Sequence, residues 1–305
     1  MLNNYPAHLD EKVRVSFEME SEEALNNSAI NVLFDVGNTN DYSEGFTGME
    51  WGTGVDYFGE SANINDVTNA ESYTAILVSD EFGGKIIVTR KEMNNVPDAT
   101  TLFNKVISKR KTTLISDTAN FVEEQAMEML NLGHTTQLAP DSVAIFGTHT
   151  YKSTGAAFTN TSTTVAGEAA LTELEAYAGN FKDANGKPIP FSPKTLIVKK
   201  GGSASVSFRK VLAGDNKLQA ATIGNVNIYN NGDYTLIESP FVTSDTAWYA
   251  MDTRKDNALI VDFVKRPSLN PRITRENLDE VTIQDGSFKF GCVYLPMFWY
   301  GSTGV

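Results

Sequence analysis

The chain has 305 residues, of which 41% are hydrophobic and 21% charged, a composition typical of a folded protein of about two domains. Lys and Arg total 25 against 38 Asp and Glu, so the net charge is -13, and no basic run stands out. These values exclude tight phosphate binding, and the absence of a signal pattern or of an apolar run near the roughly 20 residues of a membrane span excludes membrane classes. We therefore expect a soluble protein made in the cytoplasm.

The first 70 residues are rich in Asn, Gly, Asp and Ser, with only short apolar islands such as 30–34 and 57–58. This composition predicts no compact unit. It favours an arm or wrapping segment that is ordered mainly by contact with another chain.

Residues 73–90 read as a β-hairpin. Two β-rich runs, 73–78 and 85–90, flank a polar loop in which adjacent glycines supply positive φ without steric cost. An isolated two-stranded hairpin is marginally stable in water, so we expect its tip to contact a neighbouring subunit. The expected contact residues are Asp80, Glu81, Phe82, Gly83, Gly84 and Lys85.

Two amphipathic helices are predicted. The stronger covers 114–132, where apolar residues recur in steps of four and three on one face, and Gly133 ends it. The second covers 168–181, with Thr163 or Thr164 as a candidate N-cap. A turn at 183–187, a strand at 195–199 and a short helix ending near Gly214 follow.

The rest of the chain is predicted to be mostly β, with strands at 226–229, 234–237, 246–251, 258–264, 281–283 and 288–300. Turn signals at 230–233 and 284–287 separate these runs. Cys292 is the one cysteine of the chain, so neither an intrachain disulfide nor a cysteine-based zinc site can form. Its apolar neighbours predict a core position.

Residue patterns that carry chemistry are weak. The three histidines form no pair at metal-binding spacing, no phosphate-binding glycine loop can be written, and no serine stands in a Gly-x-Ser-x-Gly elbow. The turn at 183–187 resembles part of a calcium loop but lacks the bidentate Glu. The three tryptophans fit a core or an interface better than a base-stacking platform. We expect no catalysis, cofactor or metal.

An ordered series of motifs occupies the region 144–252. Its parts are Phe-Gly-Thr-His at 146–149, Phe-Thr-Asn at 158–160, a helix with Leu171 and Leu174, Asp-Ala-Asn-Gly-Lys-Pro-Ile-Pro at 183–190, Pro-Lys-Thr-Leu-Ile-Val at 193–198, and Ala-Trp-Tyr at 247–249 with Asp252. Each part is weak, but their order and spacing resemble the major head subunits of Mu-like and related tailed phages.

The resemblance implies the α+β Hong Kong 97 type capsid fold. Its parts would be an N-terminal arm (1–53), an extended E-loop hairpin region (54–95), a peripheral domain with a long spine helix (96–164), an axial domain (165–251), and strands returning to both domains (252–305). Because the arm is short, assembly guidance would come from a separate scaffolding protein.

The resemblance further implies a major capsid protein, many copies of which assemble as pentamers and hexamers into an icosahedral head. The head would enclose double-stranded DNA without sequence-specific binding, would be built in the cytoplasm of the bacterial host, and could carry a decoration protein. Two alternatives stay open: an encapsulin-like nanocompartment shell, which would copurify with a cargo enzyme, and a secreted carbohydrate-binding or hydrolytic protein, which would be a monomer.

Overall fold

The computed structural model describes residues 7–50, 70–95, 99–213, 229, 233–252, 257–271, 273–274 and 279–305. The chain divides into two compact units, each built from segments that are far apart in the sequence. The first unit consists of Met1–Glu44, Val78–Ala126 and Val261–Phe290, and the second consists of Gly45–Leu77, Met127–Ile260 and Gly291–Val305. The five-part division expected from the resemblance stays a prediction.

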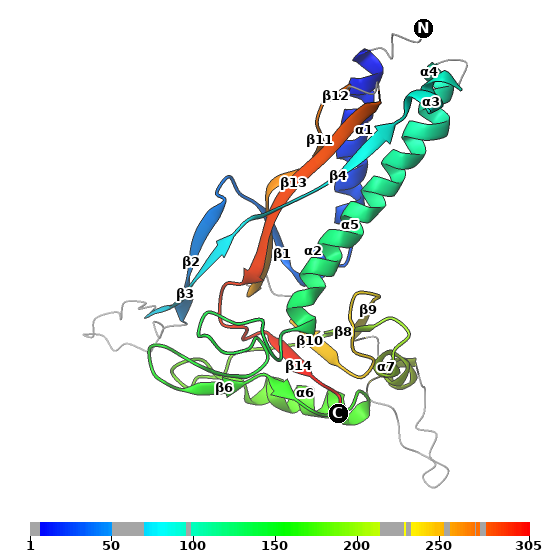
Figure 1. Ribbon diagram of the computed structural model, residues 1–305. Coiled ribbons are helices and arrows are strands. Elements are labelled where there is room, and N and C mark those ends of the chain that lie inside the picture. Colours follow the sequence, from blue (N-terminus) through cyan, green and yellow to red (C-terminus); the bar gives the residue numbers. More distant parts are fainter. Residues whose placement is uncertain are drawn as a thin grey trace, which may run out of the picture. The chain divides into compact units, whose positions relative to one another are not determined.

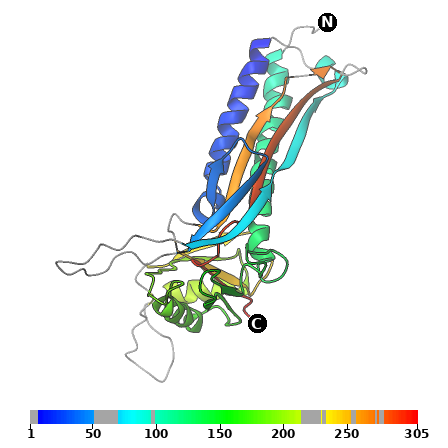
Figure 2. The ribbon, with the colours of Figure 1, turned by 90° about the vertical axis from the view of Figure 1, so that its left-hand side faces the viewer.

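The first unit packs long helices against a sheet. Its helices are α1 (Ala7–Asn26), α2 (Ile30–Leu33), α3 (Arg90–Asn94), α4 (Ala99–Leu102), the π-helix Phe103–Ile107 and most of α5 (Ser108–Asn131). The strands β1 (Asp35–Asn38), β11 (Leu259–Leu269), β13 (Glu280–Cys292) and β12 (Ile273–Thr274) lie in that order, and β4 (Asp80–Val88) also pairs with β13. Figures 1 and 2 show α1 and α5 running together along this sheet.

The predicted helix at 114–132 is confirmed as α5, which begins earlier, at Ser108. Its apolar stripe is buried, with Ile115, Val122 and Met129 each less than 9% exposed. Lys111 is also buried, and its ammonium donates to Glu20 Oε1 at 2.6 Å, which joins α5 to α1. Removing a charge from water is costly unless it is paired, so this contact fixes the two helices against each other.

The expectation that the first 70 residues form no compact element is wrong. Residues 7–26 form α1, and Val13, Phe17 and Leu25 on one face of this helix are buried. Val13 and Phe17 share a hydrophobic cluster with Ile86 of β4 and Ile115 of α5. The spacing of four and eight was visible in the sequence, but six Asp and Glu residues interrupt it and lowered the apolar signal.

The predicted hairpin at 73–90 is also wrong in its pairing. The run 73–78 belongs to β3 (Ala70–Val78), which pairs with β2 (Ser43–Glu50), whereas the run after it belongs to β4, which pairs with β13 from Glu280↔Val88 to Phe288↔Asp80. The expected tip at 80–85 is therefore part of a strand. The same pairing overturns the turn predicted at 284–287, which lies within β13.

Glycines misled the turn predictions because they serve close packing here. A Cβ on Gly84 would come within 2.4 Å of Leu114 Cδ1, and one on Gly286 within 2.6 Å of Phe82 Cζ. Neither glycine has a positive φ. Glycine in a strand often marks such a close approach rather than a turn.

The second unit is centred on a mixed sheet with the order β7-β14-β10-β8-β9. These strands are β7 (Thr161–Ser162), β14 (Trp299–Ser302), β10 (Trp248–Met251), β8 (Thr195–Lys199) and β9 (Thr235–Ser239). The helices α6 (Glu168–Asn180) and α7 (Ser203–Ala213) pack on one face of the sheet, where Leu171, Phe208 and Trp248 are fully buried. The strands β5 (Thr148–Thr150) and β6 (Ala157–Thr159) precede α6 in the sequence and form a separate two-stranded sheet.

Most sequence predictions for this unit are confirmed. The helix at 168–181, the strand at 195–199 and the short helix after it correspond to α6, β8 and α7. Neither Thr163 nor Thr164 caps α6, whose N-cap is Gly167. The strands at 234–237 and 246–251 correspond to β9 and β10, and the strand at 258–264 corresponds to β11, which lies mostly in the first unit. Of the strand predicted at 226–229, only Tyr229 is among the described residues, and it lies in a turn. Within the described part of the chain, no helix combines the length and apolarity needed to cross a bilayer.

Candidate interaction site

A shallow groove of about 700 Å³ lies in the first unit along β4 and β13. It is lined by Tyr42, Glu81, Phe82, Gly83, Gly84, Lys85, Lys265, Ile283, Gln284, Asp285, Gly286 and Ser287. Five of the six expected contact residues are among these, and the sixth, Asp80, is exposed at the start of β4. The residues are thus brought together, although by strand pairing and not by a hairpin tip.

The groove carries charges of both signs. Lys265 Nζ and Asp285 Oδ2 form an ion pair at 2.6 Å, and both side chains are partly exposed. Burial acts to raise the pKa of Asp285, but hydrogen bonds from Lys265 and Asn270 outweigh it and lower that pKa. Within the described part of the chain, Glu81 and Lys85 have no ion-pair partner. Two exposed charges of opposite sign therefore stand ready for a partner surface.

The expected contact residue Phe82 lines the groove and is partly buried. Its ring packs against Phe121 at 5.8 Å and Phe288 at 5.3 Å between ring centroids, inside the unit. Tyr42 and Ile283 also line the groove, and their side chains are 58% and 41% exposed. The intersubunit role of the groove stays a prediction.

A second exposed surface belongs to the ribbon of β2 and β3, which form a two-stranded sheet among the described residues. Met49 and Ile76 are 70% and 71% exposed. Each of these large apolar side chains is a candidate contact point for a partner surface. The sequence signal was the alternation around Ile76, but β2 was missed because its glycines and polar residues resemble a loop.

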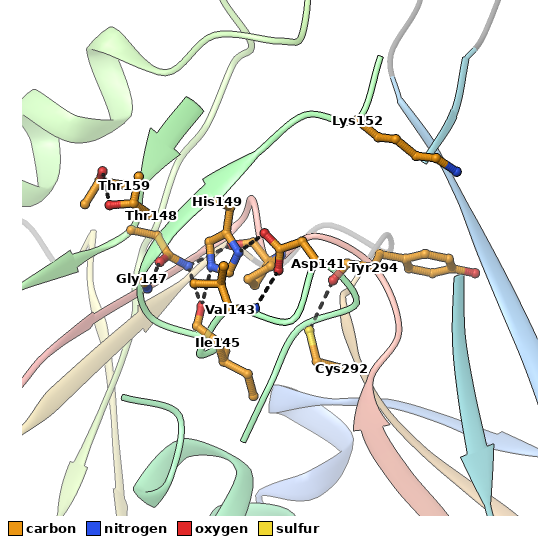
Figure 3. Close-up of polar contacts among 12 residues, drawn as sticks. Asp141, Val143, Ile145, Gly147, Thr148, His149, Lys152, Thr159, Cys292 and Tyr294 are labelled. Atoms are coloured by element: carbon orange, nitrogen blue, oxygen red, sulfur yellow. Dashed lines mark hydrogen bonds and ion pairs between the residues drawn. The ribbon is translucent and has the colours of Figure 1, made fainter. Parts of the chain in front are cut away.

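A buried polar cluster in the second unit has the residue types of a cysteine-based catalytic triad. His149 Nδ1 lies 2.9 Å from Asp141 Oδ2, and Cys292 is buried nearby, where burial is the main cause that raises the pKa of its thiol far above the ordinary value (Figure 3). A nucleophilic cysteine needs a lowered pKa and a free base. The pKa of the Cys292 thiol is raised instead of lowered, and His149 is not a free base.

Both ring nitrogens of His149 are already used. Its Nε2 lies 3.0 Å from the carbonyl oxygen of Ile145, which can only accept, so that nitrogen carries a proton (Figure 3). The Cys292 thiol donates to the carbonyl of Tyr294 at 3.1 Å and not to the histidine. The cluster therefore positions the backbone of 141–149 and offers no nucleophile. Among the described residues, no group of three or more His, Cys, Asp or Glu could hold a metal ion.

Comparisons with known proteins were made by sequence and by structure. No protein-family model matches the chain, and no curated protein sequence matches it. Solved structures do match over nearly the whole chain. The virus-like particle from Pyrococcus furiosus has 13% identity and a TM-score of 0.55, covering 96% of this chain and 98% of that one.

Two phage structures give the same result. The capsid of phage XM1 is 11% identical with a TM-score of 0.53 over 90% of this chain and 91% of that one. The capsid of cyanophage P-SCSP1u is 9% identical with a TM-score of 0.55 over 90% of this chain and 86% of that one. The chain has the Hong Kong 97 type capsid fold. The predicted fold class is confirmed, whereas the narrower likeness to Mu-like heads stays a prediction.

Proposed function

We propose that the chain is a shell subunit, the major capsid protein of a tailed bacteriophage, which self-assembles into an icosahedral head that encloses double-stranded DNA. The observation that supports this most is the extent of the match, at least 90% of the chain against shell proteins of two phages and of a virus-like particle. The proposal includes pentamers and hexamers, assembly in the cytoplasm of the host, and a separate scaffolding or decoration protein.

Two exposed surfaces of the subunit fit self-assembly. The groove along β4 is lined in part by Glu81 and Lys85, which have no ion-pair partner among the described residues, and the ribbon of β2 and β3 offers Met49 and Ile76. Subunit interfaces combine such apolar contact area with charges that select the partner. We propose both as intersubunit contacts, with Phe82 as a supporting core residue.

The net charge of -13 opposes close packing of many copies. Charges on different subunits are screened over about 8 Å at physiological ionic strength, so apolar burial can exceed the repulsion. Raising the salt concentration should therefore favour shells. Steep dissociation of shells by salt would show instead that ion pairs dominate the contacts.

The test is to express the chain with and without a scaffolding candidate from the same genome and to measure its size by sedimentation and electron microscopy. Closed particles of uniform diameter are the expected result. Only monomers or dimers at physiological salt, with scaffold present, would contradict the proposal. The secreted carbohydrate-binding or hydrolytic alternative predicts that outcome, together with binding to a saccharide.

A protein-filled nanocompartment is a second candidate, since a virus-like particle is matched over 98% of its chain. The contents of purified particles separate the two. Double-stranded DNA inside supports the phage head, and one copurifying enzyme inside supports the nanocompartment.

A further inference from the structure

Glu50, the last residue of β2, is a buried carboxylate bound by one turn of the second unit. The residue is 3% exposed. Its Oε1 accepts from the backbone N–H of Lys152 at 2.6 Å, and its Oε2 accepts from the backbone N–H of Ser153 at 2.9 Å and from the Ser153 hydroxyl. Ser72 of β3 donates to Oε1 at 3.2 Å. Both carboxylate oxygens are thus held by donors.

The turn that binds Glu50 is closed by hydrogen bonds of its own. Tyr151 N donates to Ala156 O and Gly155 N to Tyr151 O, each at 2.8 Å, and Gly155 has a φ of +71° that favours glycine. Beyond the turn, β5 and β6 pair antiparallel. Thr148 and Thr159, one on each strand, join their hydroxyls at 2.9 Å (Figure 3). The turn therefore does not need the ribbon for its shape.

Two successive backbone N–H groups that point to one side form a concave site for anions. Here the hydroxyl of Ser153 adds a third donor, whereas the ammonium of Lys152 donates to the carbonyl of Ser72 at 3.1 Å. Figure 3 shows Lys152 extending from this segment. The donors suit a carboxylate or phosphate oxygen pair and would be left without a partner if Glu50 moved away.

We propose that the Lys152–Ser153 turn is an oxyanion-binding site for carboxylate or phosphate. The chain fills it with its own Glu50 and so latches the ribbon of β2 and β3 to the turn between β5 and β6. Because Glu50 is tethered, its effective concentration is on the order of millimolar or higher, and it keeps dissolved anions out. The site accepts an external anion once Glu50 is removed.

The test is the Glu50→Ala variant, in which amide hydrogen exchange is measured in the free subunit over residues 70–77. Loss of the latch should speed exchange there about tenfold, while β8 is unaffected. Sodium formate at about 0.1 M should restore most of the protection. Sodium chloride at equal ionic strength should restore less, since chloride offers one acceptor atom where the Glu50 carboxylate offers a separate oxygen to each backbone donor. Sodium phosphate tests the other class of oxyanion. The matched control is Glu71→Ala, which removes an exposed carboxylate from the same ribbon and should change nothing.

A second variant, Ser153→Ala, tests the proposal if the Glu50→Ala protein does not fold. Ser153→Ala keeps both backbone donors and removes one hydroxyl, so exchange over the ribbon should rise by about threefold. Unchanged exchange in both variants overturns the latch, and equal rescue by formate and chloride overturns the oxyanion site. None of these readouts depends on shell formation, so they remain informative even if the chain forms no particle.

Discussion

Asn160 and Gly147 are joined by a buried hydrogen bond, in which Asn160 Oδ1 accepts from the Gly147 backbone N–H at 2.8 Å. The same side chain donates through Nδ2 to the carbonyls of Ile145 at 3.0 Å and Pro296 at 3.1 Å, and it is fully buried. One amide thus satisfies backbone groups of three segments. This explains physically why the motif order of the sequence places an Asn after Phe158.

Asn160→Ala should destabilise the protein by about 2 to 4 kcal/mol. The Gly147 N–H loses its hydrogen-bond partner, and the carbonyls of Ile145 and Pro296 each lose one bond while keeping those from His149 Nε2 and the Trp299 N–H. The measurement is urea unfolding followed by tryptophan fluorescence. Asn180→Ala is the matched control, since its Nδ2 donates to Ala176 O at an exposed site, and it should cost less than about 0.5 kcal/mol. Equal losses in the two variants would contradict this role for Asn160.

Gly83→Ala should destabilise the first unit by about 1 to 3 kcal/mol, the usual cost of overpacking. An added Cβ would lie 2.4 Å from the carbonyl oxygen of Gln284 in the paired strand, and backbone cannot move aside cheaply. Gly45→Ala on β2 is the control, because a Cβ there meets nothing within 4 Å. Its unfolding free energy should be unchanged or slightly higher. Thermal unfolding of both variants decides, and a neutral Gly83→Ala would exclude the close approach.

Glu44→Gln should lower the free energy of unfolding at neutral pH, and the difference between variant and parent should disappear in acid. A hydrogen bond from the fully buried Lys289 is the main cause that lowers the pKa of Glu44 below its ordinary value of 4.5. A carboxyl with a lowered folded-state pKa stabilises the protein above the unfolded-state pKa, and this contribution is lost as pH falls through the folded-state value. Urea unfolding at pH 7 and at about pH 3.5 measures it.

The control for this pH dependence is Glu81→Gln, which removes an exposed carboxylate that has no ion-pair partner among the described residues. Its difference from the parent should be near zero at both pH values. The pKa of Asp262 is raised first by burial and also by the charge of Glu44, so the Glu44→Gln difference includes the effect of Glu44 on Asp262. A Glu44→Gln difference that is the same at both pH values would contradict the assignment.

Lys85→Glu should leave the free energy of unfolding within about 0.5 kcal/mol of the parent, since the side chain is exposed. If the groove is an intersubunit contact, the reversal adds a second unpaired negative charge to the strand that carries Glu81 and should raise the concentration needed for assembly about tenfold. Light scattering at physiological salt measures this concentration. Lys109→Glu, on exposed α5 surface outside the groove, makes the same charge change. Equal defects in the two variants would point to net charge and not to the groove.

Local sequence patterns were sufficient to predict an element whose residues alone set its periodicity. The period of Ile115, Val122 and Met129 predicted α5, and the continuous apolar run at 195–199 predicted β8 with its observed bounds. The turn at 183–187 forms as expected, with Asp183 Oδ1 accepting from the N–H of Lys187 at 2.7 Å. These features need only neighbours in the sequence.

Pairing partners could not be predicted in the same way. Gly83 and Gly84 resemble a loop in isolation, and only the approach of Gln284 and Leu114 from distant parts of the chain explains them as strand residues. The binding of Glu50 by Ser153 likewise joins residues about 100 positions apart with no shared motif.

The sequence by itself determined α5, α6 and α7, the β-rich second half, the core position of Cys292 and, through the order of its motifs, the capsid fold. The tertiary structure alone decided that β3 and β4 pair with different partners, that α1 packs into the core, and that the turn at 152–153 binds the carboxylate of Glu50. The reason is physical. Periodicity and turn chemistry depend on a few adjacent residues, whereas register, close glycine packing and buried carboxylates depend on which distant surface excludes water from them.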